Sequence, residues 1–313
     1  MGLMLYKEKI ENYLKQDQKI EELGFDKNRL SYIPEYFSSY VEQERIPNFV
    51  CLVSRFGEVA HYSHQGFKNT ESKEEINNET IFRIYSMTKP ITSVAIMMLY
   101  ERGLIRLEHE LYRYLPEFKN TEVWETGDIN NFKTKPLNNP ILIRDLLTHT
   151  AGFTYDFMLG HPAIGLYRKN GLHDYKNIET KQEMDLEEFC NKLSTLPLLF
   201  EPGEKWHYSC SIDILGRVVE VVSGMKLDAF FRENIFNPLE MLDTGFYVEK
   251  DKLDRFSDCY QTMLGSKKKN MTLSHVAGND EFSKSRNFLS GGGGLCSTIS
   301  DYANFCQMLL NKG

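Results

Sequence analysis

The stretch that decides the fold is TIFRIYSMTKPITSVAIMMLYERG, residues 80–103. Its second half is apolar almost all round and stops at Gly103, which is typical of a buried helix with a glycine C-terminal stop. Pro90 fits within the first turn, where its missing N–H costs nothing. The pattern therefore predicts that Ser86 lies at or near the N-terminus of a buried helix.

Within this stretch, Ser86 and Lys89 place a hydroxyl and an amine one helical turn apart. A serine at a helix N-terminus meets the positive end of the dipole and unpaired N–H groups, which favour a developing oxyanion. A lysine one turn further on, among apolar residues, could accept the serine proton. The spacing is equally compatible with an N-cap serine beside a solvent-seeking lysine.

Two further S-x-x-K matches occur, Ser223/Lys226 and Ser266/Lys269. Roughly one to two matches are expected by chance in a chain of this length. The first crosses a helix end and the second lies in a solvated lysine run, so both have structural explanations. Only the match at Ser86 has the setting that acyl-transfer chemistry needs.

A second candidate element is PGEKWHYSCS, residues 202–211, a loop that ends where an apolar helix begins. Tyr208 in this loop could relay a proton between nucleophile and leaving group, or could be an aromatic plug. His149 and His207 stand beside turn residues, where hydrogen-bonded structural histidines are favoured. The four glycines 291–294 indicate either close approach of a ligand to the backbone or a hinge.

The composition excludes several classes of protein. A net charge of -7 leaves no broad basic field, so we expect no nucleic-acid partner. The N-terminus has no signal-peptide pattern and no run approaches 18 apolar residues, so we expect a cytoplasmic protein with no membrane span. Six scattered cysteines without a CxxC pair favour reduced thiols and predict no metal site. We find no G-x-S-x-G, H-E-x-x-H, P-loop or G-x-G-x-x-G motif, and we expect no cofactor.

Several stretches, in one order, resemble the serine β-lactamase-like superfamily, which includes penicillin-binding proteins, class C β-lactamases and family VIII carboxylesterases. The similarity runs from about residue 24 to the end of the chain. IPNFVCLVSRFGEVAHY resembles the first two strands and FRIYSMTKPITSVAIMMLYERGLIRL the nucleophile helix. EPGEKWHYSCSIDILGRVVEVVSGMKL resembles the tyrosine-loop region, and SGGGGLCSTISDYANFCQMLLNKG the stretch before the last sheet strands.

The resemblance implies Ser86 as the acylated nucleophile and Lys89 as its general base or proton relay. It implies Tyr208 as a second base that also protonates the leaving group. The β-lactamases and peptidases usually carry an asparagine where this chain has Cys210, and this departure leans toward the esterase branch. Cys210, Gly292 and Gly293 are the candidate substrate-binding positions.

The implied fold is α+β, with a helical domain packed against an antiparallel sheet. Residues 1–85 would supply N-terminal helices and the first sheet hairpin, 86–290 the helical domain, and 291–313 a glycine loop and a returning helix. In the family, a third motif and further sheet strands follow the point where this sequence stops. We therefore expect these strands to be missing from the chain and its activity alone to be weak.

The function implied is that of a serine hydrolase, most simply a carboxylesterase acting on short-chain esters. A β-lactamase or D-Ala-D-Ala peptidase is the alternative of the same class, with a small-molecule ester or lactam as partner. An impaired fragment or a non-catalytic binding protein of the same fold is the alternative of a different class. The sequence sets no oligomeric state.

Overall fold

The computed structural model describes residues 5–15, 20–172, 174–176, 180–262 and 271–313. These residues form two compact units. Unit 1 comprises Met1–Arg83, Ile235–Ser285 and Cys296–Gly313, and unit 2 comprises Ile84–Asn234 and Arg286–Leu295.

Residues 235–285 belong to unit 1, although the sequence analysis assigned them to the helical domain. The reason is a hydrophobic cluster that joins segments far apart in the chain: Ile81, Val248, Phe256, Phe282 and Cys296. The predicted segment 291–313 is divided as well, because its glycines lie in unit 2 and its helix in unit 1.

Unit 1 is built on the antiparallel sheet β1–β2–β3. Its strands are β1 (Asn48–Arg55), β2 (Glu58–Asn69) and β3 (Glu74–Glu75), and two further pairs are β4 (Phe82–Arg83) with β9 (Cys296–Ser297) and β7 (Cys259–Thr262) with β8 (Met271–His275). Its helices are α1 (Tyr6–Lys15), α2 (Lys27–Leu30), α3 (Tyr32–Glu42) and α10 (Ile299–Leu310).

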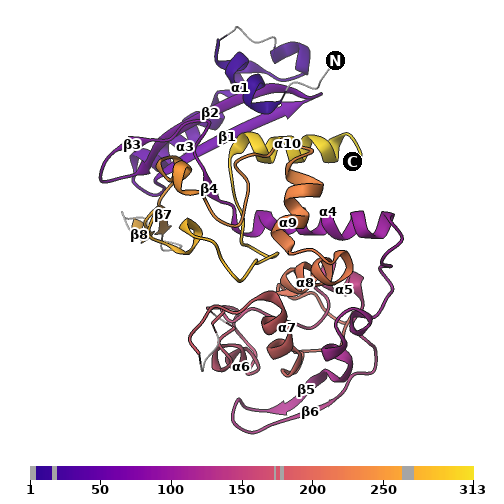
Figure 1. Cartoon of the computed structure of the whole chain (residues 1–313). Coiled ribbons are helices and arrows are strands. Elements are labelled where there is room, and N and C mark those ends of the chain that lie inside the picture. The colour runs from indigo at the N-terminus through magenta and orange to yellow at the C-terminus, as the bar shows by residue number, and fades with distance from the viewer. Residues whose placement is uncertain (1–4, 16–19, 173, 177–179, 263–270) are drawn as a thin grey trace. The chain divides into compact units, whose positions relative to one another are not determined.

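The first sheet hairpin, which the resemblance placed within residues 1–85, is formed by β1 and β2. Phe56 and Gly57 both have positive φ, at 55° and 79°, so a two-residue turn connects β1 to β2. Because side chains alternate along a strand, Val50 and Leu52 face α1 and α10, whereas Phe49 stacks on Phe37 of α3. Helices therefore cover both faces of this hairpin (Figure 1).

Unit 2 is mainly helical. Its helices are α4 (Thr88–Glu101), α5 (Ile143–Leu147), α6 (Ile164–Lys169), α7 (Leu186–Ser194), α8 (Ser211–Ser223) and α9 (Leu227–Phe231). It also contains a hairpin that the sequence analysis did not predict, β5 (Glu122–Gly127) with β6 (Phe132–Pro136). Helices α4, α5, α7 and α9 all pack against α8, which is the centre of the unit.

Helix α4 ends as its sequence predicts. Gly103 has φ +70°, its N–H donates to the Tyr100 carbonyl, and the Leu104 N–H donates to the Leu99 carbonyl. This pair of hydrogen bonds is the Schellman motif. The helix is less buried than expected, because Met97 and Tyr100 are 38% and 43% exposed.

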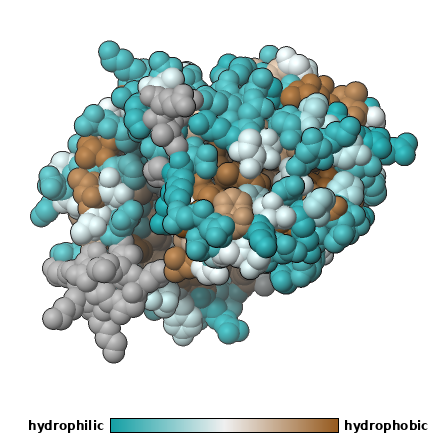
Figure 2. Space-filling view, turned by 90° about the horizontal axis from the view of Figure 1, so that it is seen from below, coloured by the Kyte–Doolittle hydropathy of each residue, from teal (hydrophilic) through white to brown (hydrophobic). Residues whose placement is uncertain are grey.

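In the part of the chain that the structure describes, no helix combines the length and apolar character needed to cross a membrane. The face in Figure 2 is mainly hydrophilic, and its hydrophobic residues form small separate groups.

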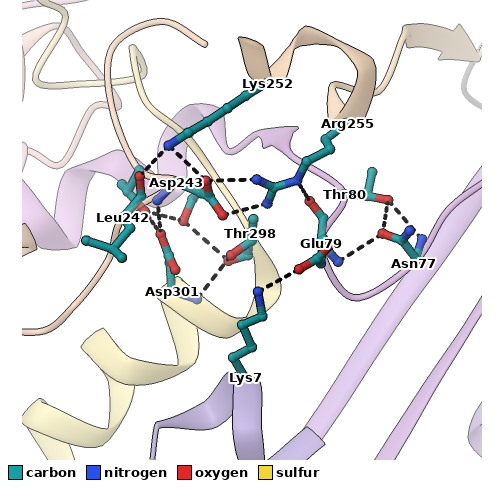
Figure 3. Close-up of polar contacts among 12 residues, drawn as sticks. Lys7, Asn77, Glu79, Thr80, Leu242, Asp243, Lys252, Arg255, Thr298 and Asp301 are labelled. Atoms are coloured by element: carbon teal, nitrogen blue, oxygen red, sulfur yellow. Dashed lines mark hydrogen bonds and ion pairs between the residues drawn. The ribbon is translucent and has the colours of Figure 1, made fainter. Parts of the chain in front are cut away.

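A polar cluster in unit 1 centres on Asp243 and Asp301 (Figure 3). The Asp301 carboxylate accepts from the backbone N–H of Asp243 at 2.8 Å and from the Thr244 hydroxyl at 2.9 Å. Asp243 is in turn paired with Lys252 at 3.0 Å and with Arg255 at 2.5 Å. Burial raises the pKa of Asp301 to about 6, and the nearby charge of Asp243 adds to this effect.

The raised pKa of Asp301 predicts a pH-dependent loss of stability. Its carboxyl stays protonated in the folded state up to about pH 6, whereas it ionises near pH 4 in the unfolded chain. The contribution of Asp301 to the free energy of unfolding therefore falls as pH rises from 4 to 6, by roughly 1–3 kcal/mol. Asp301→Asn, which cannot ionise, should gain that amount relative to wild type between pH 4 and 7 in urea titrations.

The comparison cancels the titration of the neighbouring groups, which are Asp243, Lys252, Arg255, Glu79 and Lys7. A difference between the two proteins that stays constant from pH 4 to 7 would contradict the prediction.

Candidate active site

Ser86 lies immediately before the helix that the sequence predicted. It is the middle residue of a 3-10 turn, Tyr85–Met87, which runs directly into α4. Tyr85 has φ +41°, a conformation that non-glycine residues rarely adopt and that is found preferentially at functional sites. The Ser86 side chain is exposed, so a substrate can reach it.

The structure brings Ser86, Lys89 and Tyr208 together. Ser86 Oγ lies 2.6 Å from Tyr208 Oη and 3.3 Å from Lys89 Nζ. All three residues belong to unit 2, and 122 positions separate the serine from the tyrosine. Both neighbours are within hydrogen-bond reach of the hydroxyl, which is the geometry that an activated nucleophile requires.

Lys89 is half-buried, but its head group is not surrounded by the apolar residues of its own helix. Nζ donates to the Gly292 carbonyl at 2.6 Å and lies over the rings of Tyr208 and Tyr155, 4.6 and 5.4 Å from their centroids. A carbonyl and two aromatic faces therefore hold the amine beside Ser86.

Tyr208 is positioned by the pairing of its loop with the segment 149–154. The backbone N–H of His207 donates to the His149 carbonyl at 2.9 Å, and that of Cys210 donates to the Thr154 carbonyl at 3.3 Å. The His207 ring is hydrogen-bonded to the Thr154 hydroxyl at 2.9 Å, which agrees with a structural role.

The His149 ring packs on Tyr208, with 5.0 Å between ring centroids, and its Nδ1 lies 3.2 Å from Ser209 Oγ. Burial, with a smaller contribution from the charge of Lys89, lowers the pKa of His149 to about 4. His149 is therefore neutral at pH 7.

The candidate substrate-binding residues have different positions. Cys210 is only 2% exposed and serves as the N-cap residue of α8, so a contact of its thiol with substrate gains no support. Gly292 is buried and its carbonyl is used by Lys89, while Gly293 is half-buried beside the backbone of Tyr85. The substrate contacts at these three positions remain predictions.

The two other S-x-x-K pairs differ from the first. Ser223 ends α8 and its hydroxyl donates to the Val219 carbonyl at 2.6 Å, while Lys226 is the N-cap residue of α9. The match at Ser266/Lys269 lies outside the described residues.

The sequence analysis missed a group behind the site. Asp213 of α8 is fully buried, and its carboxylate accepts from Ser290 Oγ at 2.5 Å, from the Gly292 N–H at 2.9 Å and from Tyr155 Oη at 3.4 Å. The signal available in the sequence was an acidic residue in the first turn of a mainly apolar helix, directly after the Tyr208 loop.

A protein-family model described as Beta-lactamase matches residues 33–313. The chain belongs to this family. Protein Rv1367c of Mycobacterium tuberculosis is 33% identical over 264 residues, which are 84% of this chain and 62% of the relative. Esterase EstB of Burkholderia gladioli is 34% identical over 210 residues, which are 67% of this chain and 50% of the relative.

Among solved structures, EstCE1, described as a hydrolase with promiscuous acyltransferase activity, has a TM-score of 0.73 and 26% sequence identity. The match covers 93% of this chain and 73% of EstCE1. The family and the β-lactamase-like fold that the resemblance implied are thereby confirmed. The chain spans 62% and 50% of the lengths of the two curated relatives, and the predicted absence of further strands stays a prediction.

The environment of His149 leads to a prediction that NMR can check. Burial and the charge of Lys89 disfavour the charged imidazolium. The chemical shifts of the His149 ring should therefore titrate with a pKa of about 4. His149→Gln identifies the resonance, because that signal disappears from the spectrum of the variant. A midpoint near 6.5 would show that the ring is solvated and free to charge at neutral pH.

Proposed function

We propose that this chain carries the acyl-transfer site of a serine hydrolase that acts on carboxylic esters through a Ser86 acyl-enzyme. The observation that supports it most directly is the position of Ser86 Oγ, 2.6 Å from Tyr208 Oη and 3.3 Å from Lys89 Nζ. The exposed hydroxyl thus has two groups able to take its proton.

In this proposal, Ser86 Oγ attacks the ester carbonyl carbon while its proton passes to Lys89 or Tyr208. The oxyanion develops beside the backbone N–H groups at the start of α4. The carbon–oxygen bond to the alcohol then breaks, and Tyr208 gives a proton to the departing oxygen. Water then attacks the acyl carbon while Lys89 or Tyr208 takes its proton. The bond between that carbon and Ser86 Oγ breaks, the proton passes to Oγ, and the carboxylic acid leaves.

Esters with apolar groups fit the surroundings of Ser86 best. Tyr85 and Met87 flank it in the chain and are exposed, and Trp206, 67% exposed, lies 6.4 Å from Tyr208 between ring centroids. Exposed apolar side chains next to a polar triad suit a substrate with a short hydrocarbon chain. The names of EstB and EstCE1, an esterase and a hydrolase, point the same way.

Single-turnover labelling tests the proposal. Ser86 Oγ should attack the phosphorus of a fluorophosphonate and displace fluoride into solvent. Mass spectrometry should then locate a phosphonylated Ser86, and Ser86→Ala should give no adduct. Lys89→Met and Tyr208→Phe should each label at least about 100-fold more slowly, because each removes a proton-transfer group. Folded wild-type protein without an adduct would contradict an acyl-transfer function.

The chain offers a matched control in its second S-x-x-K pair. Ser223→Ala and Lys226→Met change the same residue types, again three positions apart, but at a place remote from Ser86 in the sequence. Both variants should be labelled at the wild-type rate. Turnover of p-nitrophenyl butyrate compared with nitrocefin then separates an esterase from a β-lactamase. Nitrocefin hydrolysis that exceeds butyrate hydrolysis would overturn the choice of esters.

A further inference from the structure

The glycine segment behind Lys89 is held by two helices of unit 2. The Gly291 carbonyl accepts from Thr92 Oγ1 of α4 at 2.7 Å, and the Gly292 N–H of the same peptide group donates to Asp213 of α8 at 2.9 Å. Both ends of this peptide group are therefore fixed. The next carbonyl along the chain, that of Gly292, accepts from Lys89 Nζ at 2.6 Å.

Asp213 fixes a second point of the same segment. Its Oδ1 accepts from Ser290 Oγ at 2.5 Å as well as from the Gly292 N–H, so one oxygen atom joins the start and the middle of the turn. The turn is closed by the Gly294 N–H, which donates to the Ser290 carbonyl at 2.9 Å. Oδ2 faces Tyr155 Oη at 3.4 Å, and the Tyr155 ring lies against Lys89.

The packing leaves no room for a side chain at position 292. A Cβ atom on Gly292 would lie 2.6 Å from Asp213 Oδ2 and 2.8 Å from Tyr155 Oη, closer than real Cβ contacts. Gly292 therefore allows the backbone to pack closely against Asp213 and Tyr155. Asp213 is 0% exposed, and its carboxylate has three donors from protein groups.

We propose that Asp213 is a positioning residue, which holds the segment 290–294 so that the Gly292 carbonyl keeps Lys89 Nζ beside Ser86 Oγ. Asp213 touches neither the serine nor a substrate, and it acts through the hydrogen bond that it accepts from the Gly292 N–H. The inference rests on the proposed function, because its effect on catalysis presupposes that Ser86 is the nucleophile.

The kinetics of fluorophosphonate labelling test this role. Asp213→Ala removes the acceptor, and the maximal rate of inactivation should fall by about 100-fold, the effect of a displacement of roughly 1 Å at a reacting group. The inhibitor concentration at half-maximal rate should stay near the wild-type value, because the change affects Lys89 and not the binding of the reagent. Asp213→Asn keeps an oxygen acceptor for the Gly292 N–H and should label within a few-fold of wild type.

Thr92→Val tests the same peptide group from the other helix, and it should also slow labelling. Asp145→Ala is the matched control, because Asp145 is another buried carboxylate of unit 2 that accepts a backbone N–H, from Leu142 at 3.0 Å. It should lower the melting temperature and leave the labelling rate of the folded protein unchanged. Rates are compared only among variants that circular dichroism shows to be folded.

Two kinetic results would overturn the proposal: Asp213→Ala labelled at the wild-type rate, or Asp213→Asn slowed as much as Asp213→Ala. A crystal structure of Asp213→Ala gives a readout that does not depend on activity. The Gly292 carbonyl should then lie beyond hydrogen-bond distance from Lys89 Nζ, and an unchanged contact would overturn the proposal. If wild-type Ser86 is not labelled at all, the proposed function fails. The crystal structure of Asp213→Ala would still decide whether Asp213 positions the Gly292 carbonyl.

Discussion

The constraint on which the site depends is the close approach of the segment 290–294 to α4 and α8. A Cβ on Gly291 would lie 2.8 Å from the Ile212 carbonyl oxygen, and one on Gly292 would lie 2.6 Å from Asp213. Backbone without side chains is therefore what fits between α4, which follows Ser86, and α8, which follows the Tyr208 loop.

In this arrangement the group that contacts the Lys89 amine carries no charge, and the charged group lies behind it. The amine contacts a neutral carbonyl, and the Asp213 carboxylate stands one residue behind it, hydrogen-bonded to the Gly292 N–H. A carboxylate in direct contact would favour the charged form of an amine and compete with the serine for its protons. A carbonyl only accepts a hydrogen bond, so it orients Nζ without adding a negative charge in direct contact with the amine.

The local parts of the site could be predicted from the sequence. The turn and helix around Ser86, the glycine stop at Gly103 and the β1–β2 turn at Gly57 depend on neighbouring residues, and the structure has each of them. The N-terminus of α10 is likewise capped locally, by Thr298, whose hydroxyl accepts from the Asp301 N–H at 3.2 Å. Such features follow from backbone conformation and hydrogen bonding within a few residues.

The parts that the sequence did not predict depend on contacts between distant residues. Asp213 and Gly292 are 79 positions apart, and Arg83 pairs with Asp280, 197 positions away. A single sequence shows that Asp213 stands in a mainly apolar helix, but it does not show which hydrogen-bond donors surround the carboxylate. The environment of Lys89 was misjudged for the same reason, because Tyr155 and Tyr208 come from other segments and its own helix contributes little.

A buried carboxylate restricts several positions of the sequence at once. Asp213 lies among hydroxyl and backbone donors instead of a directly bonded cation, so each donor that is lost leaves an unsatisfied lone pair in the interior. A side chain at position 292 would displace the same carboxylate. The hydrogen bonds of the Asp213 carboxylate therefore couple three positions, namely Ser290, Gly292 and Asp213 itself. Under the proposed positioning role, a substitution at one of them changes the hydrogen bonds of the other two and shifts the Gly292 carbonyl that contacts Lys89.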